Sequence, residues 1–137
     1  VSPSAYNRRR RQHLSEDSTA IVRMFCEAFG RRDADEILSF FTEDAVYHNM
    51  PLPPVKGKAA IRTVLDMFLK PAQHVEFVML NLAVAGNTVF TERLDKFILG
   101  ARTVELPVAG VFEVKDGKIA AWRDYFDMAT WTRQTSG

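Results

Sequence analysis

The chain has 137 residues, of which 47% are hydrophobic and 26% charged, with a formal net charge of +1. This size and composition fit one globular domain with its own core and exclude a disordered chain. The single cysteine, Cys26, excludes an intrachain disulfide. No run of about 18 apolar residues is available to span a membrane. The basic start "VSPSAYNRRRRQHL" lacks the apolar segment of a secretory signal, so we expect a cytoplasmic protein.

Four of the positive charges are consecutive, Arg8 to Arg11. Without them the chain has 14 basic and 17 acidic residues, a net charge of −3. The body is therefore mildly acidic, which predicts no nucleic-acid partner. We interpret residues 1–16 as a disordered basic tail, and an anion-binding arm is the alternative.

The first half of the chain has helical patterns. "SEDSTAIVRMFCEAFGRR" (15–32) opens with helix-start residues and then spaces its apolar residues at helical intervals. "DADEILSFFTED" (33–44) predicts a short second helix with Asp33 as its N-cap. "KAAIRTVLDMFLK" (58–70) predicts a third, which ends before Pro71.

The remaining segments are strand-like. "AVYHNM" (45–50) predicts a short strand, and three prolines make "PLPPVKG" (51–57) irregular. "AGN" and "KDGK" are typical of hairpin turns between the later strands. Those strands are expected at about 73–84, 87–99, 102–114 and 118–129. Helices followed by antiparallel strands indicate an α+β fold, with the helices packed on one face of a curved sheet.

Charged residues interrupt apolar strand faces at two places. In "TERLDKF" (91–97), alternation places Arg93 and Asp95 on the same face as Phe97. In "AAWRDYFDM" (120–128), it places Asp124 between two aromatic residues on one face. Burying a lone charge costs several kcal/mol unless it is paired, and an arginine can bind two carboxylates.

One economical explanation places Arg93, Asp95 and Asp124 together at the wall of an apolar cavity. Tyr47 and Asn49 point together on the strand at 45–50. A purely structural cluster is the alternative, because one β-bulge reverses a face. Two acids bridged by one arginine can have unequal pKa values, so that one acts as a base and the other as an acid. Such a pair could add water across a strained bond or move a proton next to a carbonyl.

Three motifs, "YHNMPLPP", "TERLD" and "GVFEVKDGKIAAWRDYFD", resemble the limonene-1,2-epoxide hydrolase family over roughly residues 18 to 130. That family belongs to the nuclear transport factor 2-like, or SnoaL-like, superfamily. The resemblance implies a cone-shaped α+β fold, usually in a homodimer. A curved, mixed and mainly antiparallel six-stranded sheet would hold three to four helices on its concave face around a deep pocket.

We therefore expect a single domain at residues 17–131, followed by a short C-terminal tail at 132–137. Only five strands are evident from the patterns above. The sixth is expected in the proline-rich stretch or at a terminus.

In the family, an Asp–Arg–Asp triad, helped by a tyrosine and an asparagine, opens an epoxide with water. Carried onto the matching motifs, the arginine is Arg93, the acid is Asp95 and the base is Asp124. Tyr47 and Asn49 would help to hold the water. The resemblance implies no cofactor and no metal, which agrees with the lack of a nucleotide-binding motif or metal-ligand spacing in the sequence.

Several apolar residues are expected to line the substrate pocket: Met50, Met67, Phe68, Leu80, Phe97, Leu106, Val108, Trp122 and Phe126. Such a pocket suits a small, lipophilic, cyclic epoxide, opened in one step to a vicinal diol. Two alternatives remain open. One is a proton-transfer enzyme like the ketosteroid isomerases and polyketide cyclases. The other is a non-catalytic carrier of an apolar molecule.

Overall fold

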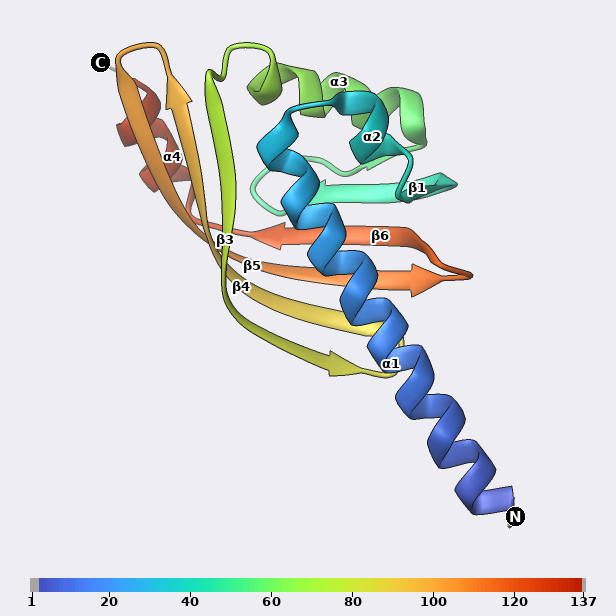
Figure 1. The fold of residues 1–137 in the computed structure, drawn as a ribbon. Coiled ribbons are helices and arrows are strands. Elements are labelled where there is room, and N and C mark those ends of the chain that lie inside the picture. The colour runs from blue at the N-terminus through green and yellow to red at the C-terminus, as the bar shows by residue number, and fades with distance from the viewer. Residues whose placement is uncertain (1–2, 137) are drawn as a thin grey trace.

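The computed structural model describes residues 3–136 and has the expected α+β fold, with four α-helices and one six-stranded sheet (Figure 1). The elements, in chain order, are α1 (Pro3–Ala28), the 3-10 turn η1 (Phe29–Arg31), α2 (Ala34–Leu38), β1 (Phe41–Asn49), β2 (Val55–Lys56), α3 (Lys58–Leu69), β3 (His74–Ala85), β4 (Thr88–Leu99), β5 (Arg102–Lys115), β6 (Lys118–Tyr125) and α4 (Met128–Thr135).

The sheet is mixed and strongly curved. Its strand order is β2-β1-β6-β5-β4-β3, and all neighbours are antiparallel except β1 and β6, which are parallel. The sheet curves around α1, which crosses its concave side, and α2 and α3 close the upper end (Figure 1). This is the cone-shaped arrangement that the family resemblance implied.

Tight turns set the register of the long strands. At the β5–β6 turn, Asp116 and Gly117 both have positive φ, of 50° and 78°. A two-residue turn of that kind matches the twist of the strands that it joins. The register places Gly110 of β5 opposite Asp124 of β6. The turn chemistry of "KDGK" therefore helps to position a predicted site residue.

An aromatic cluster forms the core between α1 and the sheet. Phe25 of α1 is fully buried and meets the rings of Phe29, Phe41, Phe112 and Trp122 edge-on, at centroid distances of 4.9 to 5.8 Å. Edge-to-face contacts at such distances are favourable. The helix is thereby fixed against strands β1, β5 and β6.

Several element boundaries differ from those expected. Residues 3–16, expected to be a disordered tail, continue α1, because alanine, arginine and glutamine favour a helix that the buried half already nucleates. Their side chains stay largely exposed. Residues 1 and 2 lie outside the described part of the chain.

The C-terminal end also differs. Asp127 accepts a hydrogen bond from the Thr130 backbone N–H and caps α4, so the last strand stops at Tyr125, and the expected tail from 132 is helical to Thr135. Gly137 is not described.

The second helix is shorter than expected, although Asp33 caps it as predicted. It ends at Leu38, and β1 starts at Phe41, which pairs with Ile119 of β6. The sixth strand is β2, and it lies in the proline-rich stretch, which was one of the two places where it was expected. Within residues 3–136, no helix is both long and apolar enough to cross a membrane.

Candidate active site

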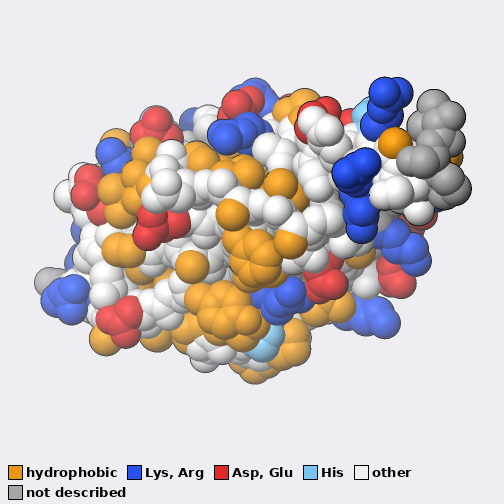
Figure 2. All heavy atoms as spheres, turned by 90° about the horizontal axis from the view of Figure 1, so that it is seen from below, with side chains coloured by type: hydrophobic (Ala, Val, Ile, Leu, Met, Phe, Trp, Pro, Cys, Tyr) orange, Lys and Arg blue, Asp and Glu red, His pale blue; other side chains and the backbone are white. Residues whose placement is uncertain are grey.

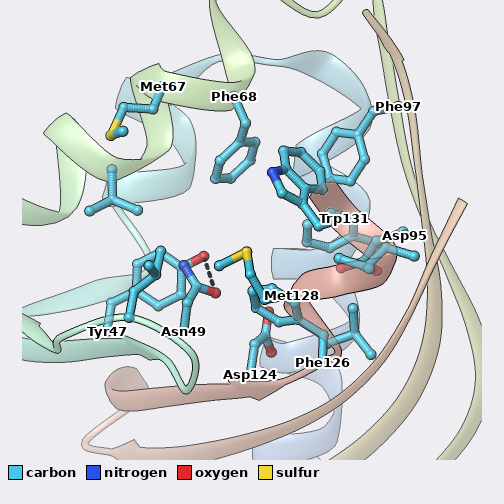
Figure 3. Close-up of a pocket in the computed structure, with 15 residues that line it drawn as sticks. Tyr47, Asn49, Met67, Phe68, Asp95, Phe97, Asp124, Phe126, Met128 and Trp131 are labelled. Carbon is cyan, nitrogen blue, oxygen red and sulfur yellow. Dashed lines mark hydrogen bonds between the residues drawn. The ribbon is translucent and has the colours of Figure 1, made fainter. Parts of the chain in front are cut away.

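A cavity of about 280 Å³ lies inside the cone (Figure 3). In that view, Met67 and Phe68 of α3 lie opposite Asp124, and Asp95 lies beside Trp131 of α4. The wall is mostly apolar and is made by Tyr47, Asn49, Leu52, Val64, Met67, Phe68, Phe77, Asp95, Phe97, Leu106, Val108, Asp124, Phe126, Met128 and Trp131. Tyr47, Asn49, Asp95 and Asp124 bring hydroxyl, amide and carboxyl groups to it, and Trp131 adds an indole.

Arg93 joins the two aspartates from behind the wall. Its Nε and Nη2 donate to Asp95 Oδ1 and Oδ2 at 3.0 and 2.9 Å. Its Nη1 and Nη2 donate to Asp124 Oδ1 and Oδ2 at 3.2 and 2.9 Å. The three residues are 1, 3 and 4% exposed, in the order Arg93, Asp95, Asp124. Two-pronged contacts of this kind fix both carboxylates in one geometry.

Three further residues surround the guanidinium of Arg93. Thr91 Oγ1 accepts from Arg93 Nη1 at 3.0 Å. The Phe77 ring lies 4.9 Å from the guanidinium carbon, within cation–π range. Gly110 faces the same group, and a Cβ there would collide with Arg93 Nη1. Glycine at this position therefore makes room for the guanidinium.

Strand pairing brings the other polar residues to Asp124. Parallel pairing of β1 and β6 puts Asn49 opposite Asp124 and Tyr47 opposite Trp122. The Tyr47 hydroxyl donates to Asn49 Oδ1 at 3.1 Å (Figure 3). The Trp122 indole N–H donates to Asp124 Oδ1 at 2.7 Å.

Burial controls the proton equilibria of the site. It raises the pKa of Asp95 to about 6, and the positive charge and hydrogen bonds of Arg93 oppose the rise. Burial also raises the pKa of Tyr47, so its hydroxyl keeps its proton. Burial disfavours the charge of Arg93, but the two carboxylates outweigh it and raise its pKa, so it stays charged. A protonated Asp95 is accessible near neutral pH.

The structure brings together all five residues expected to be catalytic. Tyr47, Asn49, Asp95 and Asp124 line the cavity, and Arg93 lies behind the two acids. Of the apolar residues expected in the pocket, six lie on its wall: Met67, Phe68, Phe97, Leu106, Val108 and Phe126.

Three expected pocket residues lie elsewhere. Leu80 is 55% exposed, because a bulge between Met79 and Asn81 interrupts the β3 alternation. Trp122 is on the predicted face but lies deeper in the core, where it stacks on Tyr47. Met50 follows the end of β1 in a turn, where strand alternation no longer predicts direction.

Five wall residues were not predicted: Leu52, Val64, Phe77, Met128 and Trp131. Val64 had a signal, because it lies one helical turn before Phe68 in α3. Met128 had one as well, because strand alternation puts it on the same face as Asp124 and Phe126. Trp131 had none, because it lies beyond the expected strand at 118–129. No group of three or more His, Cys, Asp or Glu residues within 3–136 could hold a metal ion.

The fold and site define a cone-shaped α+β protein of the nuclear transport factor 2-like and SnoaL-like class, with a buried Asp–Arg–Asp triad. A model of the "limonene-1,2-epoxide hydrolase catalytic domain" matches residues 16–136. The chain therefore belongs to the limonene-1,2-epoxide hydrolase family.

A curated protein sequence and a solved structure, both from Mycobacterium tuberculosis, agree with this assignment. Epoxide hydrolase EphG is 35% identical over 107 residues, which are 78% of this chain and 71% of that protein. The structure of an LEH-like epoxide hydrolase has a TM-score of 0.77 at 31% identity and covers 88% of this chain and 90% of that one.

The fold itself is shared more widely. A proposed polyketide cyclase from Xanthomonas campestris pv. campestris has a TM-score of 0.81 at 24% identity, with 90% of this chain and 99% of that one covered. At this identity the likeness concerns the fold alone.

Gly110→Ala should destabilise the protein by about 1–3 kcal/mol, the usual cost of overpacking. The added Cβ would collide with Arg93 and lie 2.7 Å from Asp124 Oδ1, and both groups are buried. Thermal unfolding should show a Tm lower by roughly 3 °C per kcal/mol. Gly30→Ala is the matched control, because its Cβ would meet only the Val75 carbonyl at 3.7 Å. Equal Tm values for the two variants would show that the Gly110 position is not constrained.

Proposed function

We propose that the protein is an epoxide hydrolase, which adds water directly to a small, lipophilic, cyclic, terpene-like epoxide and releases a vicinal diol without a cofactor. The main support is that Asp95 and Asp124 both line an apolar cavity, while Arg93 binds both carboxylates. A general acid and a general base can therefore act on the same substrate in this cavity. Membership of the limonene-1,2-epoxide hydrolase family supports the same activity.

Asp124 acts as the general base. In its ionised form it takes a proton from a water molecule, and the water oxygen attacks one epoxide carbon. Tyr47 and Asn49 hold this water beside Asp124. Because the Tyr47 hydroxyl donates to Asn49 Oδ1, the Asn49 amide nitrogen can donate to the water and the Tyr47 oxygen can accept from it.

Asp95 acts as the general acid. It gives its proton to the epoxide oxygen as the carbon–oxygen bond breaks, so no alkoxide has to form. Its raised pKa, about 6, keeps part of the population protonated near neutral pH. After the step Asp95 is ionised and Asp124 is protonated, and exchange with water restores the starting state. Arg93 contacts both acids throughout and favours whichever is the anion.

The site also argues against the alternatives. An isomerase or cyclase that moves one proton needs no groups to hold an attacking water, and a carrier needs neither acid nor base. Here Tyr47 and Asn49 lie at the cavity beside Asp124, and Arg93 holds Asp124 together with a second acid. The wall is otherwise apolar, which suits a lipophilic epoxide more than a charged substrate.

We further propose that the chain works as a homodimer in the cytoplasm. Phe90 and Ile98 of β4 are 46 and 38% exposed, and alternation puts them on the face opposite Arg93. Apolar side chains also gather between charged ones on the surface seen in Figure 2. A second copy would cover such a face. Light scattering on the purified protein measures its molar mass, which should be that of two chains. The molar mass of one chain at all protein concentrations would contradict the proposed dimer.

Diol formation from a panel of cyclic epoxides tests the activity, with enolisable ketones alongside to detect an isomerase. Asp95→Asn and Asp124→Asn should each lower kcat at least about a hundredfold, the range of a general acid or base. Arg93→Lys should fail similarly, because one ammonium cannot fork to two carboxylates.

Surface variants of the same types serve as controls. Asp116→Asn in the β5–β6 turn and Arg123→Lys on the opposite face of β6 should keep full activity. If Asp124→Asn retained more than about a tenth of the wild-type rate, far above the general-base expectation, its role as the base would be abandoned.

The pH dependence of kcat/KM should reveal the acid. Because burial raises the pKa of Asp95 to about 6, its proton is present below that pH and is lost above it. kcat/KM for a non-ionisable epoxide should therefore fall as the pH rises beyond about 6, once spontaneous hydrolysis is subtracted. A kcat/KM that climbs steadily through neutral and alkaline pH would exclude a carboxylic acid as proton donor.

A single turnover in H₂¹⁸O, with enzyme in excess, separates direct water attack from an aspartyl ester route. Direct attack places the label in the first diol formed and leaves the aspartates unlabelled. We expect this result because Arg93 holds both carboxylates and lowers their nucleophilicity. Ordinary oxygen in the first diol, with label in Asp95 or Asp124, would require the covalent mechanism instead.

A further inference from the structure

Trp122 was expected in the substrate pocket, but it lies behind the pocket wall. Its side chain is fully buried, and its ring stacks on Tyr47 with centroids 4.1 Å apart and planes at 7°. An indole N–H is a donor only, and a buried donor needs a partner. That partner is Asp124 Oδ1, at 2.7 Å.

The hydrogen bonds of Asp124 are unequal between its two oxygens. Oδ1 accepts from the Trp122 indole and from Arg93 Nη1. Oδ2 accepts from Arg93 Nη2 alone among the side-chain bonds made within residues 3–136. A carboxylate has about four lone-pair positions, two on each oxygen. The remaining acceptor position therefore belongs to Oδ2.

We infer that Trp122 is a positioning residue, which occupies Oδ1 of Asp124 so that Oδ2 takes the proton from the attacking water. This inference rests on the epoxide hydrolase function proposed above. The same indole supports the Tyr47 ring by stacking. One side chain thus aligns the base with a residue that holds the water.

The indole also distinguishes the two acids electrostatically. Arg93 makes two hydrogen bonds to each carboxylate, so it does not by itself decide which one carries the proton. Among the described side chains, only Asp124 receives an additional donor, from Trp122. A hydrogen bond to the charged form stabilises that form. Trp122 therefore favours ionised Asp124 and leaves the proton on Asp95.

Trp122→Phe tests the inference, because it keeps an aromatic ring but removes the N–H. kcat should fall about tenfold or more, the size of one hydrogen bond to a charged group. KM should change little, because Trp122 does not line the cavity. A general base also gives the kcat/KM profile a low-pH limb, where its protonation stops catalysis. In Trp122→Phe this limb should move to higher pH, because the charged form of the base loses one hydrogen bond.

Phe41→Leu is the matched control for packing. Phe41 is buried in the same cluster, 6.3 Å from the Trp122 ring, and is not on the cavity wall. This variant should lose stability but keep the wild-type pH profile. Where Trp122→Phe fails to fold, 3-benzothienylalanine at 122 replaces the N–H by sulfur at nearly constant shape. A donor-free variant with the wild-type pH profile would overturn the inference.

A second readout does not depend on turnover. The chain has two tryptophans, so ¹⁵N-labelled protein gives two indole signals, and Trp131→Phe identifies them. The Trp122 signal should move in Asp124→Asn and should titrate in the range of the low-pH limb. A signal insensitive to Asp124→Asn overturns the inference whatever the activity. A responsive signal in a protein that opens no epoxide of the panel instead overturns the proposed function.

Discussion

The buried ion cluster of Arg93 with Asp95 and Asp124 constrains the rest of the structure. Removing such ions from water costs several kcal/mol each, so protein groups have to replace the hydrogen bonds that the ions made with water. It does so fully: the guanidinium nitrogens reach both carboxylates and Thr91, and no buried side-chain nitrogen or oxygen within residues 3–136 lacks a partner. These hydrogen bonds require a fixed register between β4, β5 and β6. They also require Gly110, because the guanidinium occupies the space that a side chain there would take.

The charge of the cluster links its stability to the proposed chemistry. With both aspartates ionised the cluster carries a net charge of −1, and with one protonated it is neutral. A low-dielectric surrounding favours the neutral state, which is why the pKa of Asp95 rises despite the adjacent arginine. Burial thus favours the protonated form of Asp95, which is the form that the proposed reaction needs to protonate the epoxide oxygen. The two acids differ through their further contacts, because only Asp124 also accepts from the Trp122 indole among the described side chains.

Strand alternation predicted the faces of Arg93, Asp95 and Asp124, because β4 and β6 are regular at these residues, and the family resemblance supplied their expected roles. It failed at Leu80, where a bulge reverses the face, and bulges have no reliable mark in a single sequence. Alternation also reports the face of a residue and not its depth, which is why Trp122 was expected on the cavity wall. Trp131 had no signal in the sequence, since α4 is held against the sheet by long-range contacts: the packing of Trp131 on Phe97 and hydrogen bonds between Gln134 and the Glu105 backbone.

The cone itself does not determine the reaction, because one fold can carry unrelated chemistries. Chains with 24% identity or less share this fold at a TM-score of 0.81. The site of this chain depends on a set of register relations between its strands. Gly110 pairs with Thr91 on one side and with Asp124 on the other, and Asn49 pairs with Asp124 across the parallel β1–β6 contact. A change of chemistry on this scaffold would therefore involve the glycine as well as the acids, since a side chain at that position excludes the guanidinium that couples them.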